Sequence, residues 1–410
     1  MHREFMGYFN LLQTSGNTQR AAIDFLLGKG NAPDDLRHFA EITDPLARMD
    51  LLAQALLTSY KDYARAGLRR EGGGLPELYR SRMFQEAMDC RYQQMNTLGL
   101  MPALPDMDML PFGSFALTFT FTLRTPYISK DDVSLHILDN PVRKDRVFGL
   151  PMVASTTWKG LLRATMMQPL ASDLLSKKID ENVFVKKRLQ LYRLFGNEAD
   201  GAAEFLARAW AQFRAGPRPE NRDETAAWKE KFHKALEKVS EEFDRVLREK
   251  KYRIGEMEGF QGALYFYPTF FTRLSLEVIN PHDRQSNAGK QPIYFECVPD
   301  GAHGTFSLLY APFDLIGADE AEIRRQALAD LQLVAEGLKE MFLTYGFSAK
   351  RTSGYGVAEE TVTNGLLTGR FPGRQAPTST QPWPTWTFRS FTELVGISAR
   401  IAQQLQGGTR

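Results

Sequence analysis

Residues 112–128 read FGSFALTFTFTLRTPYI, and this stretch decides the fold. Large apolar side chains fall on every second residue, with small or polar residues between them. They are Phe115, Leu117, Phe119, Phe121 and Leu123. Because successive side chains of a β-strand point to opposite faces, this alternation predicts a strand with one face in a core and the other face in solvent.

The chain after this strand alternates between helical and extended patterns. Helical spacing of apolar residues recurs from about residue 157, over 221–252 and over 318–346, whereas β-branched and aromatic runs occupy 262–279, 292–298, 304–313 and 357–364. The runs at 262–279 and 292–313 each predict a pair of strands. The resulting strand–helix–strand–strand–helix–strand order predicts an α+β fold, a ferredoxin-like (RRM-like) sheet with large insertions.

Three parts of the chain are predicted from these patterns. Residues 1–105 read as a helical extension, and residues 106–365 as the ferredoxin-like domain or domains with a helical insertion at about 200–255. Residues 366–410 read as a Pro-rich linker followed by a short C-terminal amphipathic segment.

Composition restricts the classes of function. The net charge is only +2, from 51 basic and 49 acidic residues, so any nucleic-acid site must be local rather than spread over the surface. One basic window exists at 141–163, where five basic residues accompany one acid. Two isolated cysteines argue against zinc and disulfides, and no apolar run is long enough for a membrane helix. With no leader pattern at the N-terminus, we expect a cytoplasmic protein.

The segment 149–163 carries the first candidate site. Ser155 or Thr156 is placed to cap a helix that begins near Thr157, and a helix start offers unpaired N–H groups and a positive dipole end to a phosphate. Lys159 and Arg163 are four residues apart and therefore share a helical face. The alternative is an ordinary capped helix with Trp158 and Leu161–Leu162 in the core.

Two loops carry the other candidates. In 347–357, FSAKRTSGYGV, two glycines allow close approach to a partner, two cations add charge and a tyrosine offers a stacking face; the alternative is a plain helix-to-strand turn. The loop 128–147 mixes four carboxylates and one histidine with four basic residues. Carboxylates placed next to the phosphates of a nucleic acid are electrostatically unfavourable unless they bind a metal ion or a proton. The alternative interpretation of this loop is a solvent-exposed loop of acidic and basic residues without a site.

In order, these segments resemble a known family. Residues 139–163, DNPVRKDRVFGLPMVASTTWKGLLR, are similar to the hallmark of the CRISPR-associated RAMP superfamily, an Asp-x-Pro-[Val/Ile] turn before a small-hydroxyl, Lys-Gly, Arg helix start. Residues 347–357 resemble its glycine-rich loop. Residues 191–198 and 258–270 resemble its Phe-Gly and strand elements, and 274–308 resemble the subunit that caps a Cmr-type complex.

The resemblance implies a guide (crRNA)-binding subunit of an antiviral type III effector ribonucleoprotein, with crRNA, complementary target RNA and other CRISPR-associated subunits as partners. The RNA contacts it implies, together with the loops above, are Arg143, Lys144, Ser155, Thr156, Thr157, Lys159, Arg163, Lys350, Arg351, Gly354, Tyr355 and Gly356.

The resemblance also leaves the question of catalysis open. Asp139 matches the residue that cuts target RNA in the family's cleaving subunit, where a carboxylate with Mg²⁺ can help a 2′-OH attack its own phosphate. His136 is a candidate acid or base three residues earlier. The alternatives are a non-catalytic capping or adaptor subunit, with the helical extension as the docking part, or a metal-independent endoribonuclease that processes repeat RNA.

Overall fold

The segment predicted as a strand forms β1 (Phe115–Leu123) and the short β2 (Tyr127–Ile128). The alternate apolar side chains of β1 are all buried, as the pattern predicts. Its threonines lie on the opposite face, where their hydroxyls contact polar side chains of β8 (His303–Tyr310). One face of β1 therefore belongs to the core, and the other is a polar surface.

The computed structural model describes residues 16–34, 41–55, 60–68, 72–131, 136–197, 200–253, 259–280, 292–371 and 383–406. Within them, β1 is the middle strand of a five-stranded antiparallel sheet of order β10-β9-β1-β8-β4. The other members are β4 (Leu264–Phe266), β9 (Ala358–Gly369) and β10 (Thr385–Ser390).

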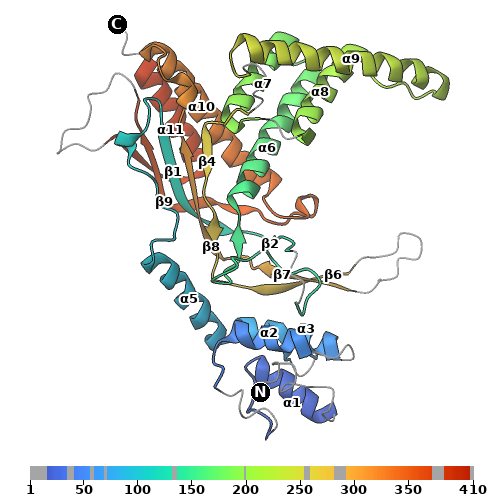
Figure 1. The fold of residues 1–410 in the computed structure, drawn as a ribbon, viewed down its shortest axis with the longest axis vertical. Coiled ribbons are helices and arrows are strands. Elements are labelled where there is room, and N and C mark those ends of the chain that lie inside the picture. The colour runs from blue at the N-terminus through green and yellow to red at the C-terminus, as the bar shows by residue number, and fades with distance from the viewer. Residues whose placement is uncertain are drawn as a thin grey trace, which may run out of the picture.

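Helices complete the ferredoxin-like order. Along the chain, β1 is followed by α6 (Ser155–Leu175), then β4, β8, α10 (Glu320–Glu340) and β9. This is the predicted strand–helix–strand–strand–helix–strand order, which confirms the α+β ferredoxin-like fold. The edge strand β10 and α11 (Phe391–Gln406) are added after it, and α10 and α11 lie together against the sheet (Figure 1).

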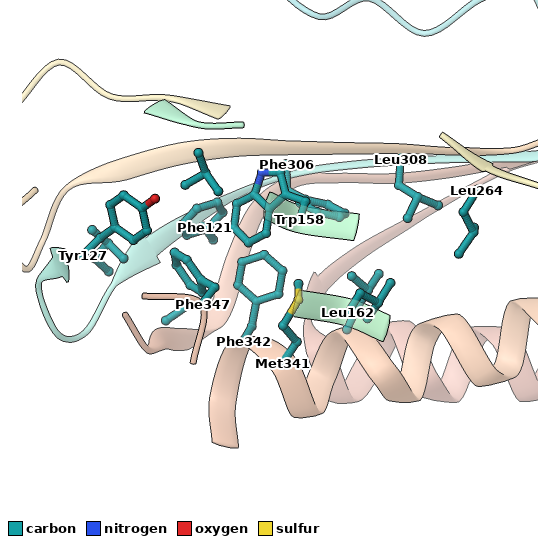
Figure 2. Close-up of a cluster of buried hydrophobic side chains, with 14 of the residues drawn as sticks. Phe121, Tyr127, Trp158, Leu162, Leu264, Phe306, Leu308, Met341, Phe342 and Phe347 are labelled. Atoms are coloured by element: carbon teal, nitrogen blue, oxygen red, sulfur yellow. The ribbon is translucent and has the colours of Figure 1, made fainter. Parts of the chain in front are cut away.

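An aromatic cluster fills the space between sheet and helices. Trp158 of α6 lies 4.9 Å from Phe347, 5.2 Å from Phe306 and 5.4 Å from Phe342, measured between ring centroids. Phe342 belongs to a π-helical turn, η7 (Met341–Tyr345), at the end of α10. Figure 2 shows these rings with Phe121 of β1 in one continuous cluster. Packing of this kind fixes the start of α6 on the sheet.

Three helices form the insertion between α6 and β4. They are α7 (Glu181–Phe195), α8 (Asp200–Ala215) and α9 (Arg222–Glu249), and they extend away from the sheet (Figure 1). The buried Arg193 of α7 pairs with Asp314 at 2.7 Å and with Asp330 of α10 at 3.5 Å. This buried ion pair joins the insertion to the ferredoxin-like core.

A second sheet lies on the side of the five-stranded sheet away from the inserted helices (Figure 1). Its order is β2–β7–β6, with β6 (Ser275–Ile279) and β7 (Ile293–Val298), and β3 (Met152–Val153) pairs separately with β5 (Thr269–Phe270). The run 262–279 was predicted as two strands and forms three, because β4, β5 and β6 pair with different partners.

The N-terminal helices lie beyond this second sheet, on the side away from the five-stranded sheet (Figure 1). They are α1 (Gly16–Leu26), α2 (Pro45–Ala55), α3 (Lys61–Ala66), α4 (Gly74–Arg80) and α5 (Arg82–Thr97). Among them α4 packs on β6, and the side chains they bury are continuous with the main core. In the described part of the chain, no helix combines the length and apolar character needed to cross a membrane.

Three boundaries differ from the sequence prediction. The helical insertion expected at about 200–255 begins with α7 at Glu181, and α9 ends at Glu249. The helix expected to begin near Thr157 begins at Ser155, and its N-cap is Ala154, which makes no side-chain cap. The expected boundary at residue 365 falls inside β9, because β10 pairs with the second half of that strand. Of the Pro-rich linker, residues 372–382 lie outside the described residues.

Candidate nucleic-acid interface

The start of α6 presents backbone donors without acceptors. Ala154 is extended, with φ −69° and ψ 151°, and its carbonyl accepts the N–H groups of Thr157 and Trp158. The N–H groups of Ser155 and Thr156 have no acceptor among the described residues. Ser155 is half-buried and Thr156 is exposed, so solvent reaches this end of the helix. Free N–H groups at a helix start favour an anion.

Two cations lie on α6 next to these donors. Lys159 and Arg163 are one helical turn apart, both are half-buried, and neither has an ion-pair partner among the residues that the structure describes. Partial burial lowers the pKa of Lys159, and the positive charge of Arg163 lowers it further. The fold thus holds two like charges together without a counter-charge, which is unfavourable unless an anion binds there.

Burial of Trp158 sets the direction of this helix start. Its side chain is fully buried and its indole N–H donates to the Thr269 hydroxyl at 3.1 Å. Leu162, one turn later, is also fully buried. The apolar face of α6 therefore points to the sheet, as the alternative interpretation expected. Lys159 and Arg163 do not belong to that apolar face.

The glycine-rich loop lies beside this helix start, because Phe347 contacts Trp158. Gly356 has φ +71°, and a Cβ there would come within 2.3 Å of the Cβ of Ser348, so only glycine fits. Gly354, with φ +83°, is exposed at the loop tip and open space surrounds it. The loop is anchored at both ends: Ala349 donates its N–H to the Ile128 carbonyl, and Gly356 donates to Pro126.

The polar side chains of this loop are partly engaged by the second sheet. The Lys350 ammonium lies 5.1 Å from the centre of the Phe295 ring, and the Tyr355 hydroxyl donates to Glu277 at 3.1 Å. Lys350 is exposed, whereas Arg351 and Tyr355 are half-buried. Burial raises the pKa of Tyr355, and the hydrogen bond to Glu277 raises it further. The loop thus packs against β6 and β7, while the Lys350 side chain remains accessible to solvent.

The third segment, the turn at 139–144, is fixed by Glu296 of β7. This carboxylate is fully buried and accepts the Tyr79 hydroxyl at 2.6 Å and the Val142 N–H at 3.0 Å, and it pairs with the Lys144 ammonium. Burial raises the pKa of Glu296, but the charge of Lys144 and the hydrogen bonds from Lys144 and Tyr79 lower it more, so this pKa lies below its usual value. Lys144 is therefore turned inward, whereas Arg143 beside it is exposed.

His136 faces the same carboxylate and not Asp139. Its Nε2 lies 3.9 Å from Glu296, and its Nδ1 accepts the Leu138 N–H at 3.1 Å. Burial lowers the pKa of His136 more than the Glu296 charge raises it, so the imidazole is neutral at pH 7. Residues 132–135 of the same loop lie outside the described residues.

Asp139 is paired with the N-terminal extension. Its Oδ1 accepts the Lys61 ammonium at 3.1 Å, and its Oδ2 accepts the Arg65 guanidinium at 2.6 Å, both from α3. Partial burial raises the pKa of Asp139, but the hydrogen bond from Lys61 and the charge of Arg65 outweigh it, so the pKa lies below the usual value. The carboxylate nevertheless remains 66% exposed.

This arrangement does not fit a Mg²⁺ ion at Asp139. Lys61 and Arg65 already compensate the charge of Asp139, and their positive charges repel a metal ion placed against the same carboxylate. Among the described residues, no group of three or more His, Cys, Asp or Glu side chains is placed to hold a metal.

A family model for the RAMP superfamily matches residues 120–359, more than half of the chain. The chain belongs to the RAMP superfamily. The matched residues contain all three segments of the candidate interface: the turn at 139–144, the start of α6 and the whole glycine-rich loop with its anchors. No curated protein matches the sequence.

Solved structures similar to this RAMP protein are remote. A chain of a type III-B Cmr-beta complex bound to cognate target RNA is 13% identical, with a TM-score of 0.38 over 84% of this chain and 98% of that chain. Cmr6 from Pyrococcus furiosus is 17% identical, with a TM-score of 0.28 over 60% and 99% of the two chains. A Csm3–Csm4 subcomplex of a type III-A CRISPR–Cas interference complex is 12% identical, with a TM-score of 0.28 over 70% and 95%.

Sequence reasoning missed Glu296, the residue that fixes the turn at 139–144 of the candidate interface. It lies in the predicted strand 292–298, PIYFECV, and a single acidic residue in a strand is usually expected to face solvent. Its three hydrogen-bond and ion-pair partners are 152 to 217 residues away in sequence. Only the position of the acid among buried strand residues hinted at an internal role.

Proposed function

We propose that this RAMP protein is a guide-RNA-binding subunit of a type III CRISPR–Cas effector complex. The observation that carries the proposal is the pair of uncompensated cations, Lys159 and Arg163, beside the free N–H groups at the start of α6. An RNA backbone supplies the phosphates that such a site lacks. Family membership and the resemblance of 139–163 to the RAMP hallmark support the same role.

The glycine-rich loop extends this site in our proposal. Lys350 and Arg351 are on the loop beside the α6 start, and Gly354 leaves room for a sugar–phosphate chain to approach the backbone. Arg143 adds an exposed cation from the turn. A phosphate path from Arg143 past the α6 start to Lys350 accounts for the placement of all three segments.

The proposal is tested by guide retention in the assembled complex. We expect the double variant Lys159→Ala/Arg163→Ala to lose guide RNA during a salt wash that the unmodified complex withstands. If the two side chains contact phosphates, the slope of log affinity against log salt for single-stranded RNA falls by about 1.4, or about 0.7 for each contact. The matched control is Lys231→Ala/Lys238→Ala, which removes two exposed cations from α9. Equal retention for both double variants contradicts the assignment.

We further propose a non-cleaving, capping position for the subunit, in which Asp139 anchors the N-terminal helices. Both carboxylate oxygens accept from Lys61 and Arg65, which supports an anchoring role over metal-assisted cleavage. The complex with Asp139→Ala should then cut labelled target RNA at the same positions as the unmodified complex. Loss of a single cut site would assign catalysis to Asp139 and remove the capping proposal while leaving guide binding intact.

A further inference from the structure

A cavity of about 310 Å³ opens where α6, α7 and α10 meet, away from the proposed RNA path. Its floor is apolar and its mouth is charged. The floor is formed by the buried Met166, Leu170 and Leu191, and the half-buried Leu333 and the exposed Pro169 complete the apolar lining. The charged residues are Asp173, Lys187, Glu336 and Glu340. Three carboxylates against one ammonium give the mouth a net charge of −2, which repels an RNA backbone.

A buried hydroxyl in the lining has no partner. Thr165 is 2% exposed, and its Oγ1 makes no hydrogen bond in the structure. Four residues later, Pro169 has no N–H, so the Thr165 carbonyl lacks the donor that an α-helix normally supplies. In this residue of the cavity lining, the hydroxyl therefore has no partner, and the carbonyl lacks its usual helical donor. Buried polar groups without partners cost stability unless a ligand satisfies them.

Most other polar groups of the cavity are acceptors as well. Gln190 donates one N–H of its amide to Asp330 at 2.7 Å, and its carbonyl oxygen remains an acceptor. Glu336 and Glu340 are exposed, one turn apart on α10, and have no partner among the described residues. Asp173 lies 3.6 Å from the exposed Lys178. Because acceptors predominate in this lining, a matching ligand carries mainly donors, as ammonium and guanidinium groups do.

We propose that the cavity binds an organic cation on an aliphatic stem, an alkylammonium or alkylguanidinium group. The stem would lie on the apolar floor, and the cationic head would lie between Glu336, Glu340 and Asp173. This is the division of chemistry that lysine, arginine and polyamines share. The source is either a free polyamine or a basic side chain of a neighbouring protein.

Isothermal titration of the full chain without RNA tests the proposal, with spermidine and Nα-acetyl-L-arginine methylamide as probes. Both titrations are run at 0.15 M salt, where distant surface charges are largely screened. We expect saturable binding of at least one probe, and about tenfold weaker binding by Glu336→Gln/Glu340→Gln. Binding of spermidine alone identifies a free polyamine as the source, and binding of the arginine derivative identifies a protein side chain.

The matched control is Glu237→Gln/Glu241→Gln, which removes two exposed carboxylates at the same spacing from α9. It should leave the affinity unchanged. The absence of binding by both probes, or equal weakening by the two double variants, overturns the proposal. Because the titrations contain no RNA, neither of these results bears on the proposed guide-RNA site.

Discussion

Replacing Glu296 by glutamine keeps the shape of the side chain and removes its charge. Three groups then lose their anionic acceptor: the Tyr79 hydroxyl, the Val142 N–H and the Lys144 ammonium. The ammonium has a side-chain exposure of 16%, so water compensates it only in part. Breaking a buried ion pair by removing one partner costs about 3–5 kcal/mol, and we expect the lower end because the glutamine oxygen still accepts one hydrogen bond.

Native-state hydrogen exchange measures this loss at the turn itself. The Val142 amide donates to Glu296, so its protection reports whether the turn is held. A loss of about 3 kcal/mol corresponds to exchange about 150-fold faster in peptides that contain Val142. Urea unfolding of the same variant measures the change in the free energy of unfolding of the whole protein. The control is the double variant Glu296→Gln/Lys144→Met, which removes both charges and should regain much of the lost stability.

Two outcomes would refute this reasoning. The first is exchange at Val142 within about fivefold of the unmodified protein, which is a change of only about 1 kcal/mol. The second is that Glu296→Gln/Lys144→Met is no more stable than Glu296→Gln. If the ion pair contributes to stability, the effects of changing its two partners must be coupled.

Two further predictions concern His136 and the glycine-rich loop. Because the folded-state pKa of His136 is lowered, the unfolded chain binds more protons below pH 6.5, and stability should fall as the pH decreases from 7.5 to 5.5. His136→Gln should flatten this part of the urea-midpoint profile, and an unchanged slope contradicts the assignment. Gly356→Ala should destabilise more than Gly354→Ala, because both have positive φ but only the former Cβ meets Ser348. Equal urea midpoints for the two variants would show that the close approach is absent in solution.

The sequence predicts the elements whose signal is local. The alternation from Phe115 to Leu123 predicted β1, and the helical spacing over 318–346 predicted α10, because each pattern is complete within one element. The order of these elements was sufficient to predict the ferredoxin-like sheet. The strand β10 was not predicted, since Thr385–Ser390 follows a Pro-rich stretch and is paired on one side only.

The side-chain pairing of the candidate site could not be predicted in the same way. From the sequence, Lys144 is predicted to contact RNA, like its neighbour Arg143. The direction of the Lys144 side chain depends, however, on its ion pair with Glu296, which is 152 residues away in sequence. Asp139 reads as an isolated carboxylate, but Lys61 and Arg65 reach it from 78 and 74 residues upstream. Contacts of this length depend on the folded topology and leave no periodic signal in the sequence.

The bond from Tyr79 to Glu296 also constrains biosynthesis. Its two partners are 217 residues apart, and at about 5–20 residues per second the ribosome needs roughly 10–40 s to make the intervening chain. Throughout most of that interval Leu75, Leu78 and Tyr79 of α4, which are buried in the finished protein, lack the strand β6 on which α4 packs. The nascent N-terminal helices therefore emerge with an uncovered apolar face, and a chaperone or an early-binding subunit has most to protect at this stage.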